Sequence, residues 1–280
     1  AVSYESDSLQ VEPAELVITV EDSSRIYGDN NPTFRWDMDG LVSGDHFDTS
    51  GLNLTTSATA SSDVGEYIIS ASGLVDSNYT IHYFDGTLTV TPATLTLTAN
   101  DSERDYGSAN PDLTYSLGGL KLDDQFDDVL AGASVSTAAL QSDNVGNYAI
   151  RVGAELINDN YQLELVDGIL SINRVDLDLY LEQASRVYGE RNPELELTAI
   201  GLVNGDTVDV LQNVSTQILA NEYSPTGTYT IRLLNADASN YNIRSLNNSS
   251  LTITPRALVI SADSYSREYG DANPGFTASF

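Results

Sequence analysis

The pattern of hydrophobic and polar positions along the chain is that of short β-strands separated by turns. Residues 15–20 are rich in β-branched side chains, and residues 33–38 alternate between apolar and polar positions. Further strands are expected near residues 51–56, 64–70, 78–81 and 88–90. The pair Asp85-Gly86 lies between two apolar runs, which predicts a hairpin turn there, and Asp167-Gly168 predicts the same turn about 80 residues later.

One motif of eight residues organises this pattern because it occurs four times, at intervals of about 80 residues. Such self-similarity indicates a structural unit copied in tandem, and the period approaches the size of a small domain. Glycine after tyrosine suits a backbone with positive φ, and Asn-Pro favours a rigid turn. The motif tyrosine is expected to pack into its own domain and to donate its hydroxyl to nearby backbone. The copies are Arg25–Pro32, Arg104–Pro111, Arg186–Pro193 and Arg267–Pro274.

A structural role for this motif is favoured over a binding role, because an element needed to fold each copy appears in each copy. The residues assigned this role are Tyr27, Gly28, Pro32, Tyr106, Gly107, Pro111, Tyr188, Gly189, Pro193, Tyr269, Gly270 and Pro274.

The motif divides the chain into three complete repeats between two fragments. Repeat 1 is predicted at residues 13–91, repeat 2 at 92–173 and repeat 3 at 174–254. Residues 1–12 align with the last strand of a preceding repeat, and residues 255–280 align with the start of a following one. The connections, such as Thr91-Pro92, contain no Gly/Ser linker, so short, stiff joints and an end-to-end rod are expected.

Composition narrows the class of protein. The chain has 41 acidic and 12 basic residues and a formal charge of −29, which argues against nucleic acid and anionic membranes as partners. No apolar run is long enough to span a bilayer, and any secretion signal would lie outside this piece. The chain has no cysteine, which excludes disulfides and thiol chemistry. Acidity, repetition and abundant Thr, Ser, Asn and Asp together favour a bacterial surface or secreted protein.

Several spaced motifs resemble those of MBG repeats, the mucin-binding-like β-grasp domains of large bacterial surface proteins. These motifs are Tyr-Gly-x-x-Asn-Pro, Gly-Leu-x-x-Gly-Asp (residues 40–45), Gly-x-Tyr (65–67), Asn-Tyr (78–79) and the closing Gly-x-Leu-x-Val (86–90). The resemblance covers essentially the whole chain. It implies mainly β units of β-grasp type, in an adhesin or biofilm-matrix protein such as those exported by two-partner secretion. An immunoglobulin-like β-sandwich is the alternative fold. Residues 40–47 lack the period of a strand, so one short helix per repeat is a further expectation. Asp123-Asp124 replaces Gly-Asp in repeat 2, so a different loop is expected there.

Candidate chemistry is sparse. The densest acidic cluster makes Asp123, Asp124, Asp127 and Asp128 the first candidates for calcium, although a solvated acidic loop is the favoured interpretation. Trp36 is the candidate for a sugar-binding platform, against the favoured alternative of a core residue. His46 and His82 occupy different repeat positions and match no metal or catalytic spacing, and no other cofactor is expected.

Two functions from different classes remain. The first is a non-enzymatic extender of a secreted or cell-surface adhesin, in which each repeat contacts its neighbours. The second is a multivalent module that binds mucin glycans or exopolysaccharide. An enzyme such as a glycosidase would need paired carboxylates in one cleft, and no such cleft is predicted.

Overall fold

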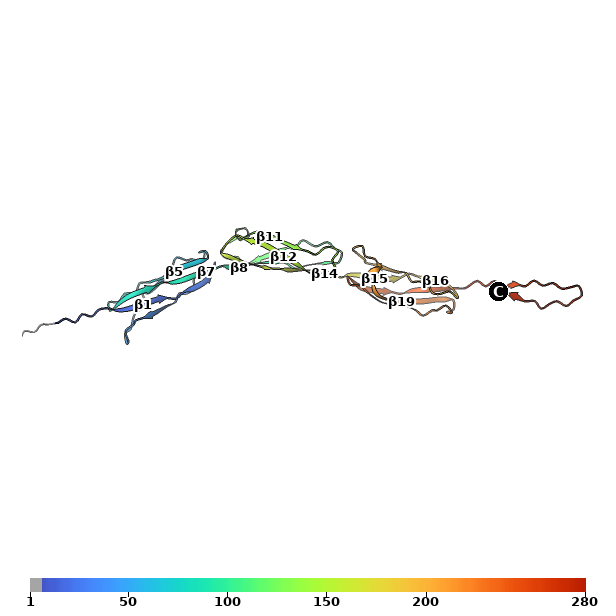
Figure 1. The fold of residues 1–280 in the computed structure, drawn as a ribbon, viewed down its shortest axis with the longest axis horizontal. Coiled ribbons are helices and arrows are strands. Elements are labelled where there is room, and N and C mark those ends of the chain that lie inside the picture. The colour runs from blue at the N-terminus through green and yellow to red at the C-terminus, as the bar shows by residue number, and fades with distance from the viewer. Residues whose placement is uncertain (1–6) are drawn as a thin grey trace, which may run out of the picture. The chain divides into compact units, whose positions relative to one another are not determined.

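The computed structural model describes residues 7–280, which form three sets of strands and little helix (Figure 1). Contacts divide the chain into two compact units. The first contains the described residues up to Ser102 together with 112–138 and 149–169, and the second contains 103–111, 139–148 and 170–280. The division runs through repeat 2, so each of the two joints between complete repeats lies within one unit.

Every repeat has one three-stranded and one four-stranded sheet, which confirms the prediction of a mainly β unit. In repeat 1 the orders are β3-β1-β6 and β2-β7-β5-β4. Parallel pairs join β1 to β6 and β2 to β7, and the other pairs are antiparallel. The strands are β1 (Ala14–Val20), β2 (Ser23–Ile26), β3 (Trp36–Asp39), β4 (Asn53–Thr56), β5 (Gly65–Ser72), β6 (Tyr79–Phe84) and β7 (Gly86–Thr91).

Repeats 2 and 3 have the same two sheets. Their orders are β10-β8-β13 with β11-β12-β14-β9, and β17-β15-β20 with β16-β21-β19-β18. The strands are β8 (Ala93–Ala99), β9 (Ser102–Asp105), β10 (Tyr115–Gly118), β11 (Leu130–Thr137), β12 (Gly146–Leu156), β13 (Tyr161–Val166), β14 (Gly168–Asn173), β15 (Val175–Leu181), β16 (Ala184–Val187), β17 (Leu197–Ile200), β18 (Gln212–Ile218), β19 (Gly227–Asp237), β20 (Tyr241–Asn247) and β21 (Ser249–Thr254).

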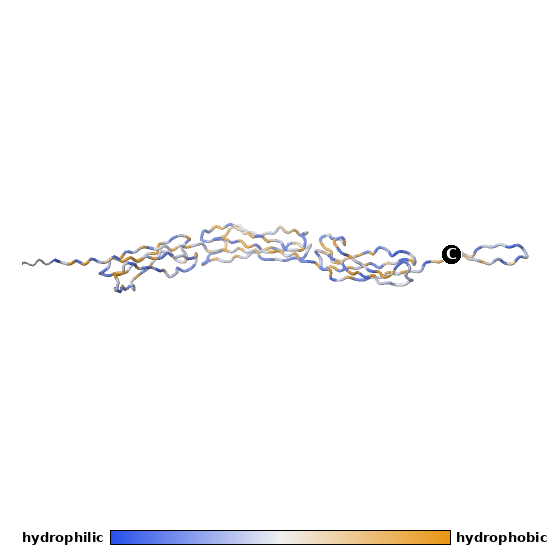
Figure 2. Tube along the Cα trace, turned by 60° about the horizontal axis from the view of Figure 1, so that its bottom comes forward, coloured by the Kyte–Doolittle hydropathy of each residue, from blue (hydrophilic) through white to orange (hydrophobic). Residues whose placement is uncertain are grey.

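Alternation along these strands produces the core of each repeat. In β1, Leu16 and Ile18 are completely buried, whereas Glu15 and Thr19, on the opposite face of the strand, are exposed. Ile69 from β5 and Leu88 from β7 belong to the same core cluster, so side chains from both sheets meet in it. Figure 2 shows the corresponding alternation of hydrophobic and hydrophilic positions.

The helix prediction holds for one repeat only. Repeat 2 contains the four-residue helix α1 (Phe126–Val129), and repeat 3 has a single 3₁₀ turn at Val208–Val210. The equivalent stretch of repeat 1 is assigned neither, and Phe47 from this stretch instead enters the core beside Tyr79. Among the described residues, no helix is long and apolar enough to cross a membrane.

The predicted Asp-Gly hairpin is wrong. β6 and β7 are consecutive strands, but β6 pairs with β1 and β7 pairs with β2 and β5, so Asp85 marks a crossing between sheets. Gly86 does not have positive φ. It is small because a Cβ there would lie 2.8 Å from the carbonyl oxygen of Val20. Close approach of two backbones, rather than a tight turn, explains this glycine.

The terminal fragments differ from each other. Residues 1–6 of the predicted preceding strand lie outside the described residues, and residues 7–13 form no strand, since no strand among the described residues pairs with them. At the other end, β22 (Ser261–Ala262) pairs with β23 (Ala278–Ser279). Counted from the motif tyrosine, this pairing has the register of β1 with β3 in repeat 1.

Candidate functional site

The repeated motif folds around a buried arginine that no sequence argument had singled out. Arg25 is 7% exposed, and its Nε donates to Asn31 Oδ1 at 2.8 Å. Its other guanidinium nitrogens donate to the carbonyl oxygens of Ile26 and Thr59. Asn31 in turn donates to the carbonyl of Ala58 at 2.7 Å. The motif arginine and asparagine therefore tie the turn to the loop that precedes β5.

The same clamp occurs in the other two complete repeats. Arg104 is 7% exposed and donates to Asn110 at 2.7 Å and to the Leu140 carbonyl at 2.7 Å. Arg186 is 5% exposed and donates to Asn192 at 2.8 Å. A buried guanidinium must have its donors satisfied, and backbone carbonyls here do so in place of a carboxylate. The buried arginine, bonded to the motif asparagine and to backbone carbonyls, is a physical reason for the motif to recur in each repeat.

The motif tyrosine faces the next repeat, which corrects the expectation that its hydroxyl bonds to nearby backbone. Tyr27 of repeat 1 donates to Asp124 Oδ2 of repeat 2 at 3.2 Å. Tyr161 of repeat 2 donates to the same oxygen at 2.5 Å. The rings of Tyr27 and Tyr161 meet edge to face, with centroids 5.4 Å apart. One carboxylate thus accepts two tyrosine hydroxyls across the joint.

The joint between repeats 2 and 3 has the same construction. Tyr106 donates to Asp206 Oδ2 at 3.1 Å, and Tyr241 donates to it at 2.7 Å. The two rings again meet edge to face, with centroids 5.7 Å apart. Tyr27 and Tyr106 are only 6% and 4% exposed, whereas Tyr188, the equivalent residue of repeat 3, is 42% exposed. Burial of the motif tyrosine therefore accompanies docking on the next repeat.

A second polar contact lies beside each tyrosine pair. Asn160 accepts a hydrogen bond from the backbone N–H of Val64 at 2.8 Å and donates to Asp63 at 2.8 Å. In the next joint Asn240 accepts from the N–H of Val145 at 3.0 Å and donates to Asn144. These asparagines come from the Asn-Tyr motif, whose tyrosines are Tyr161 and Tyr241. Both residues of that motif therefore serve the joint.

The glycine after the motif tyrosine lies against the following repeat. A Cβ added at Gly28 would be 2.5 Å from Lys121 Cβ, and one added at Gly107 would be 2.8 Å from Val203 Cγ2. Lys121 also pairs with Asp29 across the joint at 2.8 Å. Tyrosine, glycine and the next residue thus form the contact surface of the turn, and the joint has no room for a larger residue at the glycine.

Burial shapes the electrostatics of the joint. Burial raises the pKa of Tyr161 to about 12, and its hydrogen bond to Asp124 acts in the same direction. Burial likewise raises the pKa of Tyr241 to about 12, with Asp206 contributing to the increase. Burial and then Asp124 raise the pKa of Tyr27. The joint therefore requires tyrosines that keep their hydroxyl protons, because each of them donates to the shared aspartate oxygen.

The loop that carries the aspartate differs in repeat 2, as the sequence predicted. Positive φ falls on Leu122 in repeat 2, on Gly44 in repeat 1, and on both Asn204 and Gly205 in repeat 3. A backbone hydrogen bond nevertheless closes the loop at the same place, from Asp124 N to the Lys121 carbonyl in repeat 2. The conformation of the turn changes while the carboxylate keeps its position.

The side chains predicted as candidates for calcium or sugar binding make contacts within the protein instead. Asp124 accepts hydrogen bonds from two tyrosines, and Asp128 Oδ2 accepts one from the backbone N–H of Gln125. Over residues 7–280, no group of three or more acidic or histidine side chains is placed to hold a metal ion, Asp123 and Asp127 included. Trp36 is partly buried and packs against the core of repeat 1. Its position does not distinguish it as a binding platform.

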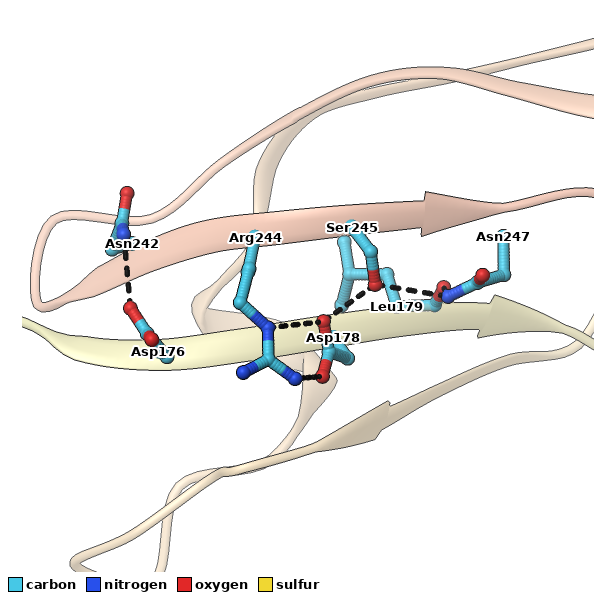
Figure 3. Close-up of polar contacts among 7 residues, drawn as sticks. All are labelled: Asp176, Asp178, Leu179, Asn242, Arg244, Ser245 and Asn247. Carbon is cyan, nitrogen blue, oxygen red and sulfur yellow. Dashed lines mark hydrogen bonds and ion pairs between the residues drawn. The ribbon is translucent and has the colours of Figure 1, made fainter.

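Polar side chains also fasten the parallel strands β15 and β20 of repeat 3 (Figure 3). Arg244 donates through two nitrogens to Asp178, and Ser245 donates to the same carboxylate at 2.5 Å. Arg244 holds the pKa of Asp178 below its usual range. Asn242 donates to Asp176 at 2.9 Å. These side chains hydrogen-bond to each other rather than to a ligand. We therefore interpret this row of contacts as stabilising the pairing of β15 with β20.

Sequence reasoning singled out Tyr27, Tyr106 and Asp124 but did not assign them to a joint, although a signal for the joint was present. Aspartate recurs at residues 45, 124 and 206, and Asn-Tyr recurs at 78–79, 160–161 and 240–241. The aspartate lies 18 residues after the motif tyrosine in all three repeats, and the asparagine lies 51, 54 and 52 residues after it. The recurrence could not show that residues of two different copies meet, because every copy contains both partners.

Comparison with known proteins identifies the repeats. The family model described as MBG domain (YGX type) matches residues 16–89, 95–171 and 177–252. No curated protein matches the chain. Solved structures match distantly. Drosophila N-cadherin EC1-4 has 8% identity and a TM-score of 0.30, and the match covers 87% of this chain and 76% of that chain. Sidekick-1 immunoglobulin domains 1-4 have 14% identity and a TM-score of 0.28, and the match covers 84% of this chain and 74% of that chain. These likenesses are too distant to support an inference. The family matches account for most of the sequence, and this chain therefore belongs to the MBG domain family of the YGX type, as three tandem copies.

Proposed function

We propose that this segment is a non-enzymatic extender of a secreted or cell-surface bacterial adhesin. Its role would be to hold a binding region away from the cell, in attachment or biofilm formation. The observation that carries the proposal is the joint, which is built from the same residue types between repeats 1 and 2 and between repeats 2 and 3. A domain array selected for reach needs joints that limit bending, and a recurring joint supplies that property.

The connecting peptide supports the same role. A single residue, Pro92, separates β7 from β8, and Arg174 alone separates β14 from β15. The backbone N–H of Tyr27 donates to the carbonyl of Thr91, the last residue of β7, at 2.8 Å. The turn that docks on the next repeat is therefore fastened to the strand that leads into it. Such a connection allows few backbone rotations, in contrast to a Gly/Ser linker.

The charge of the chain fits an array of similar domains. Forty-one acidic residues against twelve basic ones keep neighbouring molecules apart, since like charges oppose association. Side-by-side pairing of repeats through their sheet edges is a hazard for tandem β domains. Repulsion opposes it over the Debye length of about 8 Å at physiological salt. Within this proposal, neighbouring repeats are the partners of each repeat.

Small-angle scattering tests the proposal. The wild-type chain is expected to have the maximum dimension of three repeats placed end to end. Tyr106→Ala is expected to increase flexibility, seen as a broader distance distribution and a plateau in the Kratky plot. Tyr188→Ala is the matched control, because this motif tyrosine is already 42% exposed, and it should leave the curve unchanged. A wild-type curve typical of a compact globule would exclude an extender.

Glycan binding is the competing function, and the same chain tests it. Each repeat would need to bind mucin glycans or exopolysaccharide weakly, with avidity multiplying the effect. A glycan array probed with the three-repeat chain should give no signal if the segment is only an extender. Specific binding that is lost when the chain is shortened to one repeat would favour the alternative.

A further inference from the structure

Repeat 1 has a docking surface like those of repeats 2 and 3, but no Tyr-Gly turn occupies it among the described residues. We call this surface, formed by Val42, Asp45, Asn78 and Tyr79, the socket of repeat 1. Tyr79 donates to Asp45 Oδ2 at 2.7 Å, and the N–H of Val42 donates to the Tyr79 hydroxyl at 3.2 Å. With residues 11–14 and Ser77, these side chains line a hollow of about 420 Å³. The hydrogen bonds are thus set before any partner is present.

The occupied socket of repeat 3 contains the same four residue types. Tyr241 donates to Asp206, and the N–H of Val203 donates to the Tyr241 hydroxyl at 3.1 Å. Val203 packs against the cluster that contains Tyr106 of the preceding repeat. Val42, its counterpart in repeat 1, is 54% exposed. The two sockets therefore differ in whether they are covered, while their internal bonds are alike.

From this match we infer that the socket of repeat 1 binds the Tyr-Gly turn of an MBG repeat joined directly ahead of Pro13. The tyrosine of that turn would donate to Asp45, as Tyr27 does to Asp124. Its glycine would lie on Val42, as Gly107 lies on Val203. The backbone N–H of the residue just before its Gly-x-Tyr strand would donate to Asn78, as that of Val64, which precedes β5, does to Asn160. This inference rests on the proposed function and names the partner of the same kind of surface.

The covalent connection is the reason for choosing a tandem repeat over a separate molecule. Each joint consists of one aromatic pair and a few hydrogen bonds, and the Lys121–Asp29 ion pair of the first joint is partly exposed, so solvent weakens it. Such a contact is weak between free molecules. Joining the partners raises the effective concentration to the millimolar range or above. A Tyr-Gly turn supplied on its own should therefore not fill the socket.

Single-cysteine labelling tests the inference, because the wild-type chain contains no cysteine. Val42→Cys is introduced into two chains: the present chain, and one in which a second copy of residues 13–91 replaces residues 1–12 ahead of Pro13. The added copy supplies a Tyr-Gly turn that is known to dock. Ile68→Cys in the same repeat, at a position 64% exposed, is the control for labelling of an open site. Val203→Cys in the present chain reports on an occupied socket.

The added repeat is expected to slow maleimide labelling of Val42→Cys by about tenfold or more, as local protection does, and to leave Ile68→Cys unchanged. Changing the tyrosine of the added turn to alanine should restore the fast rate. Equal labelling of Val42→Cys with and without the added repeat, while Val203→Cys stays protected, would overturn this inference alone. Fast labelling of Val203→Cys as well would show that the internal joints are open, and the proposed function would fail with it.

Discussion

Substitution of Gly28 by alanine is expected to have two effects. It strains the backbone of the turn, and it also opens the joint between repeats 1 and 2. Gly28 has φ +84°, a conformation that costs an alanine about 1–2 kcal/mol. The new Cβ would also lie 2.5 Å from Lys121 Cβ and 2.9 Å from its Cγ. Lys121 Cβ is fixed to the backbone of the next repeat, so the repeat itself must move. Overpacking of this kind costs about 1–3 kcal/mol more.

Gly189 provides a matched control within the same chain. It occupies the same position in repeat 3 and has φ +86°, so alanine there meets the same backbone strain. Its Cβ would lie 3.5 Å from the nearest atom, Arg256 Nη1, which is ordinary van der Waals contact with a flexible side chain. The difference between Gly28→Ala and Gly189→Ala therefore isolates the cost of contact across the joint.

Amide hydrogen exchange is the appropriate assay, because a chain of several domains need not unfold in one step. The N–H of Val64 donates to Asn160 across the joint, so its protection reports on docking. Gly28→Ala is expected to reduce this protection by about tenfold to a hundredfold, corresponding to about 1.4–3 kcal/mol. Gly189→Ala should leave it unchanged. Equal protection of Val64 in wild type and Gly28→Ala would refute the assignment of this glycine to the joint.

Three further predictions concern the carboxylate, the buried arginine and alkaline pH. Asp124→Ala leaves two hydroxyls without their acceptor and should cost about 1–3 kcal/mol by amide exchange at Val64, whereas Asp123→Ala at an exposed position should stay within about 0.5 kcal/mol; equal effects would contradict the joint. Arg104→Lys should cost about 2–4 kcal/mol by amide exchange in repeat 2, because the three donors of a lysine sit on one nitrogen and cannot reach acceptors that the guanidinium contacts from three separate nitrogens; a neutral result would mean that the clamp is dispensable. Tyr161, whose ordinary pKa of 10.0 is raised to about 12 in the folded chain, contributes stability that is complete below pH 10 and lost as the pH rises to about 12. An alkaline titration followed by exchange at Val64 should show this loss, and Tyr161→Phe should remove the part due to that residue.

The sequence by itself determined the repeat, the β class and the short connections between units. A motif that recurs at an interval of about 80 residues requires a unit of that length, whatever its detailed topology. Alternation in residues 15–20 likewise requires one buried face, and β1 forms there with Leu16 and Ile18 buried. These features depend on local periodicity, which is complete within a few residues.

Tertiary structure alone decided what the repeated residues contact. The sequence pattern is the same whether Tyr27 packs within its own repeat or against the next one, since every copy carries both sides of the joint. Asp85-Gly86 has the composition of a hairpin, yet only the packing of Gly86 on the backbone of Val20 shows that the chain crosses between sheets there. Local preference specifies which conformations are allowed. Pairing between distant strands, and between one copy and the next, selects among them.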